Sequence, residues 1–107
     1  MFLPGDLVRV KEQSSITRFI TAFERISSSE HAVFQSSSDL SADISRHSTD
    51  SYLVMGTETG SIHFRNSQYV EDNVELVLLL CHSKKLFWFR TCYNEVNLFE
   101  LVVEIRS

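Results

Sequence analysis

The chain has 107 residues, of which 43% are hydrophobic and 22% charged, and this composition predicts one globular domain rather than a disordered or fibrous chain. Ten Lys and Arg against fourteen Asp and Glu give a formal net charge of −4, which argues against a broad basic surface for nucleic acid. The longest apolar run, Leu76 to Cys81, is too short to span a bilayer, and no signal sequence is recognisable at the start. We therefore expect a cytoplasmic protein without a membrane anchor.

The first predicted elements are a strand and a helix. Turn-forming residues at positions 4–6 precede a short buried strand over residues 7–10. Apolar residues then recur at spacings of three and four, which predicts an amphipathic helix whose stripe is Ile16, Phe19, Ile20, Phe23 and Ile26. Several of these residues are β-branched and lose side-chain freedom in a helix, so a pair of strands is the alternative interpretation.

A Ser-rich segment follows, in which ten of the 25 residues from Ser27 to Ser51 are serine. We interpret residues 11–50 as an insertion within a single domain that covers residues 1–107, because too little chain precedes it to form a separate core. Inside it, residues 31–35 predict a brief strand. Residues 38–47 predict one or two helical turns with Ser38 as the cap.

The remainder of the sequence predicts β-structure. Residues 51–56 form an expected strand, residues 57–60 ("TETG") an expected turn, and residues 61–66 a half-buried strand with alternating apolar positions. Three further strands are expected over residues 74–81, 86 to 92 or 93, and 99–105, with "YNEVN" as a connector.

The segment from Val74 to Arg90 predicts a hairpin that is apolar on both faces. A two-residue turn at Ser83 and Lys84 would pair Leu80 with Phe87 and Leu79 with Trp88. If either face stayed in water, the favourable free energy of burying several apolar side chains, roughly 1.5–3 kcal/mol each, would be lost. The second face must therefore be covered. The cover is either the predicted helix or an outside partner, such as another protein or a second copy.

No constellation of residues points to catalysis or to a bound metal. The four histidines are far apart in sequence, and neither a zinc-type spacing nor a phosphate-binding glycine loop is present. The predicted hairpin places Cys92 opposite Glu75, roughly 20 Å from Cys81, so both thiols are expected to be free. We predict no enzyme activity, no cofactor and no metal site.

The stretches "PGDLVRV", "SYLVMG", "VELVLLLCHSKKLFWFR" and "LFELVVEI" resemble small SH3-like barrel proteins of the kind found among accessory proteins of tailed phages. The resemblance covers roughly residues 1–10 and 51–105, and no functional residue is carried over with it. It implies a mainly β (β+α) fold: a small antiparallel barrel with one amphipathic helix and the Ser-rich insertion. Loops on such rigid scaffolds often carry partner binding.

The sequence therefore predicts a non-catalytic protein–protein interaction module, a viral accessory protein in the host cytoplasm that binds a host or viral protein. The alternative is a nucleic-acid-associated SH3-like barrel, of the transcription or translation factor type, which the net charge disfavours. Homo-oligomerisation stays open. The candidate partner-binding residues are apolar side chains of the Ser-rich segment and residues of the hairpin, namely Phe34, Leu40, Ile44, Lys84, Lys85 and Trp88.

Overall fold

The computed structural model describes residues 2–11, 20–27, 30–39, 44 and 50–102. Within them all regular secondary structure is β, so the mainly β prediction is confirmed. The strands are β1 (Leu7–Val10), β2 (Ala22–Arg25), β3 (Val33–Ser36), β4 (Tyr52–His63), β5 (Val70–Leu80), β6 (Leu86–Arg90), β7 (Cys92–Tyr93), β8 (Val96–Asn97) and β9 (Phe99–Leu101).

The helix predicted over residues 16–26 is wrong where the structure describes it, because residues 22–25 form β2. This strand pairs with β3 on one edge and with β6 on the other. Pairing on both edges outweighs a weak helical pattern that β-branched residues already diluted. Residues 16–19, which carry the start of the expected stripe, lie outside the described residues.

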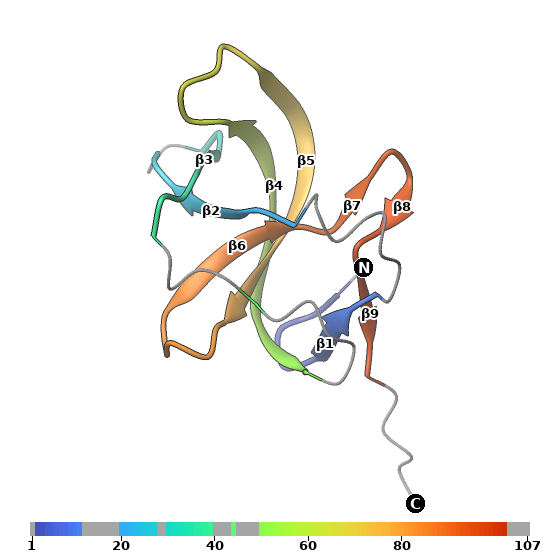
Figure 1. The fold of residues 1–107 in the computed structure, drawn as a ribbon. Coiled ribbons are helices and arrows are strands. Elements are labelled where there is room, and N and C mark those ends of the chain that lie inside the picture. Colours follow the sequence, from blue (N-terminus) through green and yellow to red (C-terminus); the bar gives the residue numbers. More distant parts are fainter. Residues whose placement is uncertain (1, 12–19, 28–29, 40–43, 45–49, 103–107) are drawn as a thin grey trace, which may run out of the picture.

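A long hairpin of β4 and β5 is the centre of the fold (Figure 1). The expected turn at residues 57–60 is wrong: β4 continues without a break through Gly60 to His63. The chain turns later, where Asn66 adopts a left-handed conformation with φ of 60°. Gly60 serves close packing instead, since a Cβ atom there would lie 2.3 Å from the backbone oxygen of Ala32, just before β3.

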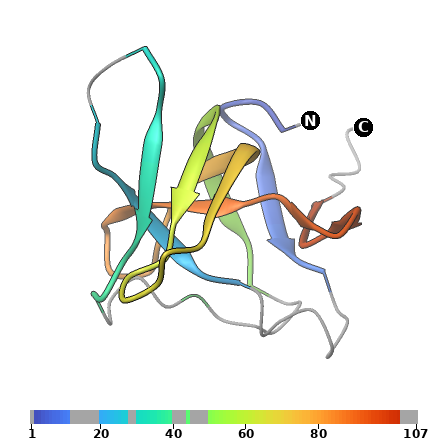
Figure 2. The same ribbon diagram turned by 90° about the horizontal axis from the view of Figure 1, so that it is seen from above.

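The pairings of five strands form a closed ring. The order is β3-β2-β6-β5-β4, and β3 also pairs with β4 in parallel. Strands β1 and β9 extend the sheet from β4, and the short β7–β8 hairpin lies apart. Both views place β2 and β3 on one side of the β4–β5 hairpin and β1 on the other (Figures 1 and 2).

The β5–β6 hairpin exists, but its predicted register is off by one residue. Leu79 lies opposite Phe87 and Leu78 opposite Trp88, because the turn has three residues rather than two. Backbone hydrogen bonds join Lys84 to Cys81 and Cys81 to Lys85, and Lys84 has a φ of 68°. This geometry is a tight turn followed by a residue in the left-handed backbone conformation, and that residue is the third residue of the turn.

The chain buries one face of the hairpin and covers the other in part. On the first face lies a core cluster that includes Val8 and Val10 of β1, Leu98, and the hairpin residues Val77, Leu79, Phe87 and Phe89. On the second face Phe23 of β2 and Phe34 of β3 pack with Leu76, and Trp88 adjoins them. Strands therefore cover part of this face in place of the expected helix, whereas Leu78 and Leu80 are half-buried and Leu86 is 46% exposed.

The strand predicted over residues 31–35 is confirmed as β3. The helical turns predicted over residues 38–47 are only partly described, and Ser38, Asp39 and Ile44 are not helical. The predicted connector "YNEVN" contains the β7–β8 hairpin, whose turn residues Asn94 and Glu95 both have positive φ. Such a turn matches the twist of the two strands that it joins.

Candidate functional site

The structure does not gather the predicted partner-binding residues into one surface. Phe34 is 0% exposed and Ile44 4%, so both belong to the core and neither is accessible to a partner in this fold. Trp88 is half-buried. Lys84 and Lys85 are exposed at the β5–β6 turn, where Lys85 forms an ion pair with Asp39 at 3.1 Å. Leu40 lies outside the described residues.

The most distinctive surface lies along one edge of β4. Strand β5 pairs with the other edge throughout, from Val54 to His63. The edge in question pairs with β1 at residues 52 and 53, and with β3 at residues 61–63 (Figure 1). Between Val54 and Ser61 no strand of the described chain pairs with it. We call this segment the β4 open edge, and at about 3.3 Å per residue it is roughly 20 Å long.

Thr57 and Thr59 direct their backbone groups out of this edge. Ser61 donates its N–H to the Ala32 carbonyl, so Ser61 faces the β3 side, and alternate residues of a strand face the same side. Val54 also faces this side, through hydrogen bonds with Gly5 and Asp6. Strict alternation would make Val54 and Ser61 face opposite sides of the strand, because an odd number of positions separates them. The register shift between Val54 and Gly56 inserts Met55 as a bulge, and this extra residue lets both face the same side.

Exposed side chains accompany these backbone groups. Met55, Thr57 and Thr59 are all exposed, whereas Gly60 is buried against Ala32. Glu58 alternates to the other face and forms an ion pair with Arg25 of β2 at 2.9 Å. An exposed row of unpaired backbone groups is a template for a further strand, and proteins commonly block such rows.

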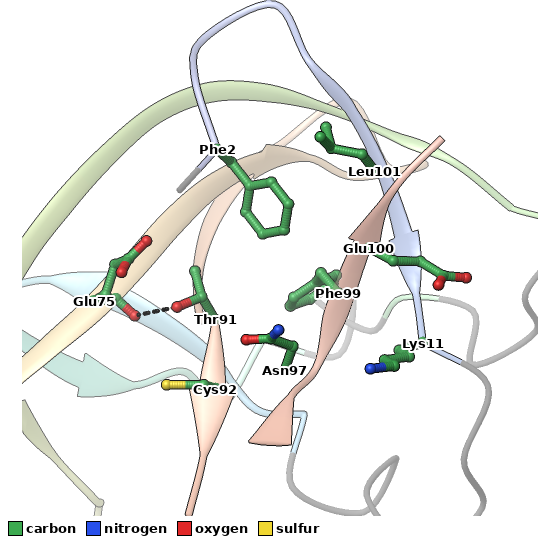
Figure 3. A pocket seen from close by; sticks show the side chains of 9 residues that line it. All are labelled: Phe2, Lys11, Glu75, Thr91, Cys92, Asn97, Phe99, Glu100 and Leu101. Carbon is green, nitrogen blue, oxygen red and sulfur yellow. Dashed lines mark hydrogen bonds between the residues drawn. The ribbon is translucent and has the colours of Figure 1, made fainter. Parts of the chain in front are cut away.

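Glu75 of β5 lies directly opposite Thr59 and borders two hollows. The smaller one, of about 180 Å³, is lined by Thr57, Glu58, Thr59 and Glu75. The larger one, of about 310 Å³, is lined by Phe2, Lys11, Glu75, Thr91, Cys92, Asn97, Phe99, Glu100 and Leu101 (Figure 3). Glu75 therefore links the β4 open edge to this larger cavity, which we call the β9 cavity.

The β9 cavity carries opposite charges that do not pair with each other. Figure 3 shows Glu75 and Lys11 on opposite sides of it, with Phe99 and Asn97 between them in this view. Within the described residues neither charged side chain has an ion-pair or hydrogen-bond partner. The backbone carbonyl of Glu75 is occupied, since it accepts hydrogen bonds from the backbone N–H of Thr91 at 3.1 Å and from its hydroxyl at 3.4 Å.

The two cysteines sit in different surroundings. Both thiols are free, as the sequence predicted. Burial raises the pKa of the Cys81 thiol from 9.0 to about 11, so at neutral pH it remains protonated and unreactive. Cys92 is half-buried and lines the β9 cavity. A reagent that reaches the cavity therefore meets only one of the two thiols.

One polar network contains the residue types of a hydrolase. The Ser61 hydroxyl donates to Oδ1 of Asp72 at 2.6 Å, and Nε2 of His31 lies 2.9 Å from Oγ of Ser61. In a catalytic triad the histidine stands between the serine and the acid, whereas here the serine stands between the other two. Ser61 is also 3% exposed. The network ties β4 to the bulged part of β5 and to the chain before β3, and its geometry does not activate a nucleophile.

Among the described residues no three His, Cys, Asp or Glu side chains are grouped as metal ligands. In the same part of the chain no helix has the length and hydropathy needed to cross a membrane.

Comparison of the chain with protein-family models, with curated proteins and with solved structures finds no match. The resemblance to SH3-like barrels of phage accessory proteins therefore stays a prediction. The β4 open edge and the β9 cavity together form the candidate functional site.

Sequence reasoning missed the residues that define this site, namely Thr57, Thr59 and Glu75. Residues 57–60 contain a glycine and polar residues, which predicted a turn and hid an exposed strand edge. The available signal was the isolated acidic residue in "NVELVLLL", a charge that interrupts an otherwise apolar strand. A charge at such a position is either paired or placed at a hollow.

Proposed function

We propose that the protein is a non-catalytic binding module that recognises a segment of another protein at the β4 open edge and the adjoining β9 cavity. The observation that carries the proposal is an exposed stretch in the middle of a central strand with which no described strand pairs. Sheet edges of this kind are a recurring mode of peptide recognition, in which main-chain hydrogen bonds supply affinity and nearby pockets supply specificity.

The finer description of the fold belongs to the same proposal. The closed ring of pairings among β2 to β6 supports a small barrel, and the sequence resemblance suggests the SH3-like kind from a phage accessory protein. On that proposal the protein works in the host cytoplasm, and its partner is a host or viral protein.

Nucleic-acid binding is the alternative, and the described charges do not favour it. Arg9, Arg25, Arg90 and Lys85 each form an ion pair with an acidic side chain. The chain as a whole carries a net charge of −4. Phosphate contacts from unpaired basic residues supply most of the non-specific affinity for nucleic acid.

The test is a selection of displayed random peptides on the immobilised full-length protein. It is followed by fluorescence anisotropy of the enriched peptides, and of mixed-sequence DNA and RNA, at about 150 mM salt. We expect saturable peptide binding and no comparable binding of nucleic acid. An empty selection combined with micromolar binding of DNA or RNA would replace the proposal by the alternative.

A further inference from the structure

We infer that the partner segment binds as an added β-strand along the β4 open edge, and that it places a basic side chain over Glu75. This inference rests on the proposed binding function and specifies which groups of the protein make the contact. The occupant is a single extended segment of a partner protein, paired to Thr57 and Thr59 through its backbone.

The backbone of the edge fixes how such a strand would pair. The outward N–H and C=O groups of Thr57 and Thr59 are two residues apart, as a strand ladder requires. The edge between Val54 and Ser61 accommodates a strand of four or five residues at about 3.3 Å per residue. Both threonines are exposed, and no described strand pairs with these backbone groups.

The flanking strands exclude direct pairing between the β4 open edges of two copies of this chain. Strands β1 and β3 both pair with the same edge of β4, one at each end of the open segment. The open edge is therefore recessed by one strand spacing, about 4.8 Å, behind its neighbours. Two equally recessed edges cannot approach each other to hydrogen-bonding distance, whereas a single extended segment fits between the flanks.

The charge preference follows from the position of Glu75. Its side chain shares a face with Thr59, and an added strand would lie two strand spacings, roughly 10 Å, from β5. A guest lysine or arginine opposite Thr59 extends along that face and meets the carboxylate across this distance. Because no described residue pairs with the Glu75 carboxylate, the guest would gain an ion pair without breaking an existing one.

The first test removes the outward backbone donor of Thr59 and leaves the β4–β5 ladder intact. Thr59→Pro deletes an N–H that faces away from β5, a position where proline is tolerated in an edge. Thr59→Val is the matched control, because it keeps both the N–H and the branched shape. For an enriched peptide carrying a fluorophore, we expect Thr59→Pro to bind at least tenfold more weakly than Thr59→Val, which has lost the same hydroxyl but keeps the backbone donor.

The second test probes the backbone hydrogen bonds of the peptide and uses only the wild-type protein. The same peptide is synthesised with a single N-methyl group at successive positions and titrated into the wild-type protein. If the peptide pairs as a strand on one edge, N-methylation lowers its affinity at every second position only.

A third test replaces the carboxylate. Glu75→Gln should weaken the binding of peptides that contain a basic residue about fivefold or more, whereas Glu24→Gln, at an exposed residue of β2, should not.

The outcomes separate the two proposals. Peptides that bind equally to Thr59→Pro and Thr59→Val, with no alternation on N-methylation, would overturn strand addition while the binding function stands. Peptides with alternation but no dependence on Glu75 would overturn the basic side chain alone. A selection that enriches no peptide would contradict both the function and the inference.

Discussion

The indole ring of Trp88 packs edge-on against the phenyl ring of Phe34, with ring centroids 5.1 Å apart and planes inclined by 61°. Trp88 belongs to β6 and Phe34 to β3, and β2 lies between these strands in the sheet. The contact therefore joins non-adjacent strands of the closed ring. It shows how β3 covers part of the apolar second face of the β5–β6 hairpin without a helix.

Truncation of Trp88 should weaken the fold itself. Trp88→Ala removes the ring contact and opens a cavity beside Phe34, and since Trp88 is half-buried we expect a loss near the lower end of the about 3–5 kcal/mol typical of buried aromatics. Leu86→Ala, at a residue that is 46% exposed, is the control and should cost less than about 1 kcal/mol. Urea denaturation measures both, and equal losses would contradict the packing described for Trp88.

Two glycines of β4 should respond in opposite ways to alanine. A Cβ at Gly60 would lie 2.3 Å from the Ala32 carbonyl oxygen, so Gly60→Ala must displace the chain before β3 and should cost about 1–3 kcal/mol. At Gly56 the nearest atoms are 3.9 Å away, so Gly56→Ala should be neutral to within about 0.5 kcal/mol. Thermal unfolding of both variants checks the contrast, and a neutral Gly60→Ala would disprove this close approach.

Stability should fall at alkaline pH because of Cys81. Its thiol has a pKa of about 11 in the fold against 9.0 when free, since burial disfavours the thiolate. Between these values the unfolded chain loses a proton that the fold retains, so this contribution is complete below about pH 9 and is lost as the pH rises towards 11. The slope from this group is at most roughly 1.4 kcal/mol per pH unit.

The measurement is the free energy of unfolding from about pH 8 to about pH 10.5, compared between variants because other groups also titrate. Cys81→Ala should flatten the dependence relative to the wild type. Cys92→Ala is the matched control and should keep it. Identical slopes in all three proteins would show that Cys81 is not the source.

The ion pair between Arg90 and Glu71 should be worth more than the surface pairs. Arg90 has an 8% exposed side chain, and apart from Glu71 its partners are the Cys92 carbonyl and the ring of Tyr93. Glu71→Gln leaves this charge buried without a counter-charge, which should cost about 1–3 kcal/mol because Glu71 itself is partly exposed. Glu100→Gln, which breaks the exposed pair with Arg9, should cost less than about 1 kcal/mol.

Local patterns in the sequence identified the strands that alternate or that carry long apolar runs. These patterns gave wrong predictions where contacts between residues distant in the sequence determine the local structure. Residues 22–25 form a strand because β3 and β6 flank them, and Gly60 is required by a chain segment that lies 28 positions earlier, at Ala32. The hairpin register failed because Lys84 adopts a positive φ although the turn contains no glycine.

The candidate site was hidden for a related reason. A strand edge is open where no neighbouring strand pairs with it. On β4 the extent of the open edge depends on where the pairing with β1 and with β3 ends. The sequence of residues 55–60 carries no mark of that. Conversely, Phe34 and Ile44 were expected at a surface because the Ser-rich segment around them offered no obvious core, and the core they join is built by distant strands.

The pairing of β1 with β9 has a consequence for the order of folding. Val8 lies opposite Leu101, far away in the sequence, whereas β4 and β5 pair as neighbouring strands of one hairpin. Contacts between distant positions form slowly, and without β9 the fully buried Val8 and Val10 lack the covering Phe99. The β4–β5 hairpin should therefore form early, and the docking of β9 onto β1 should complete the core in a late folding step.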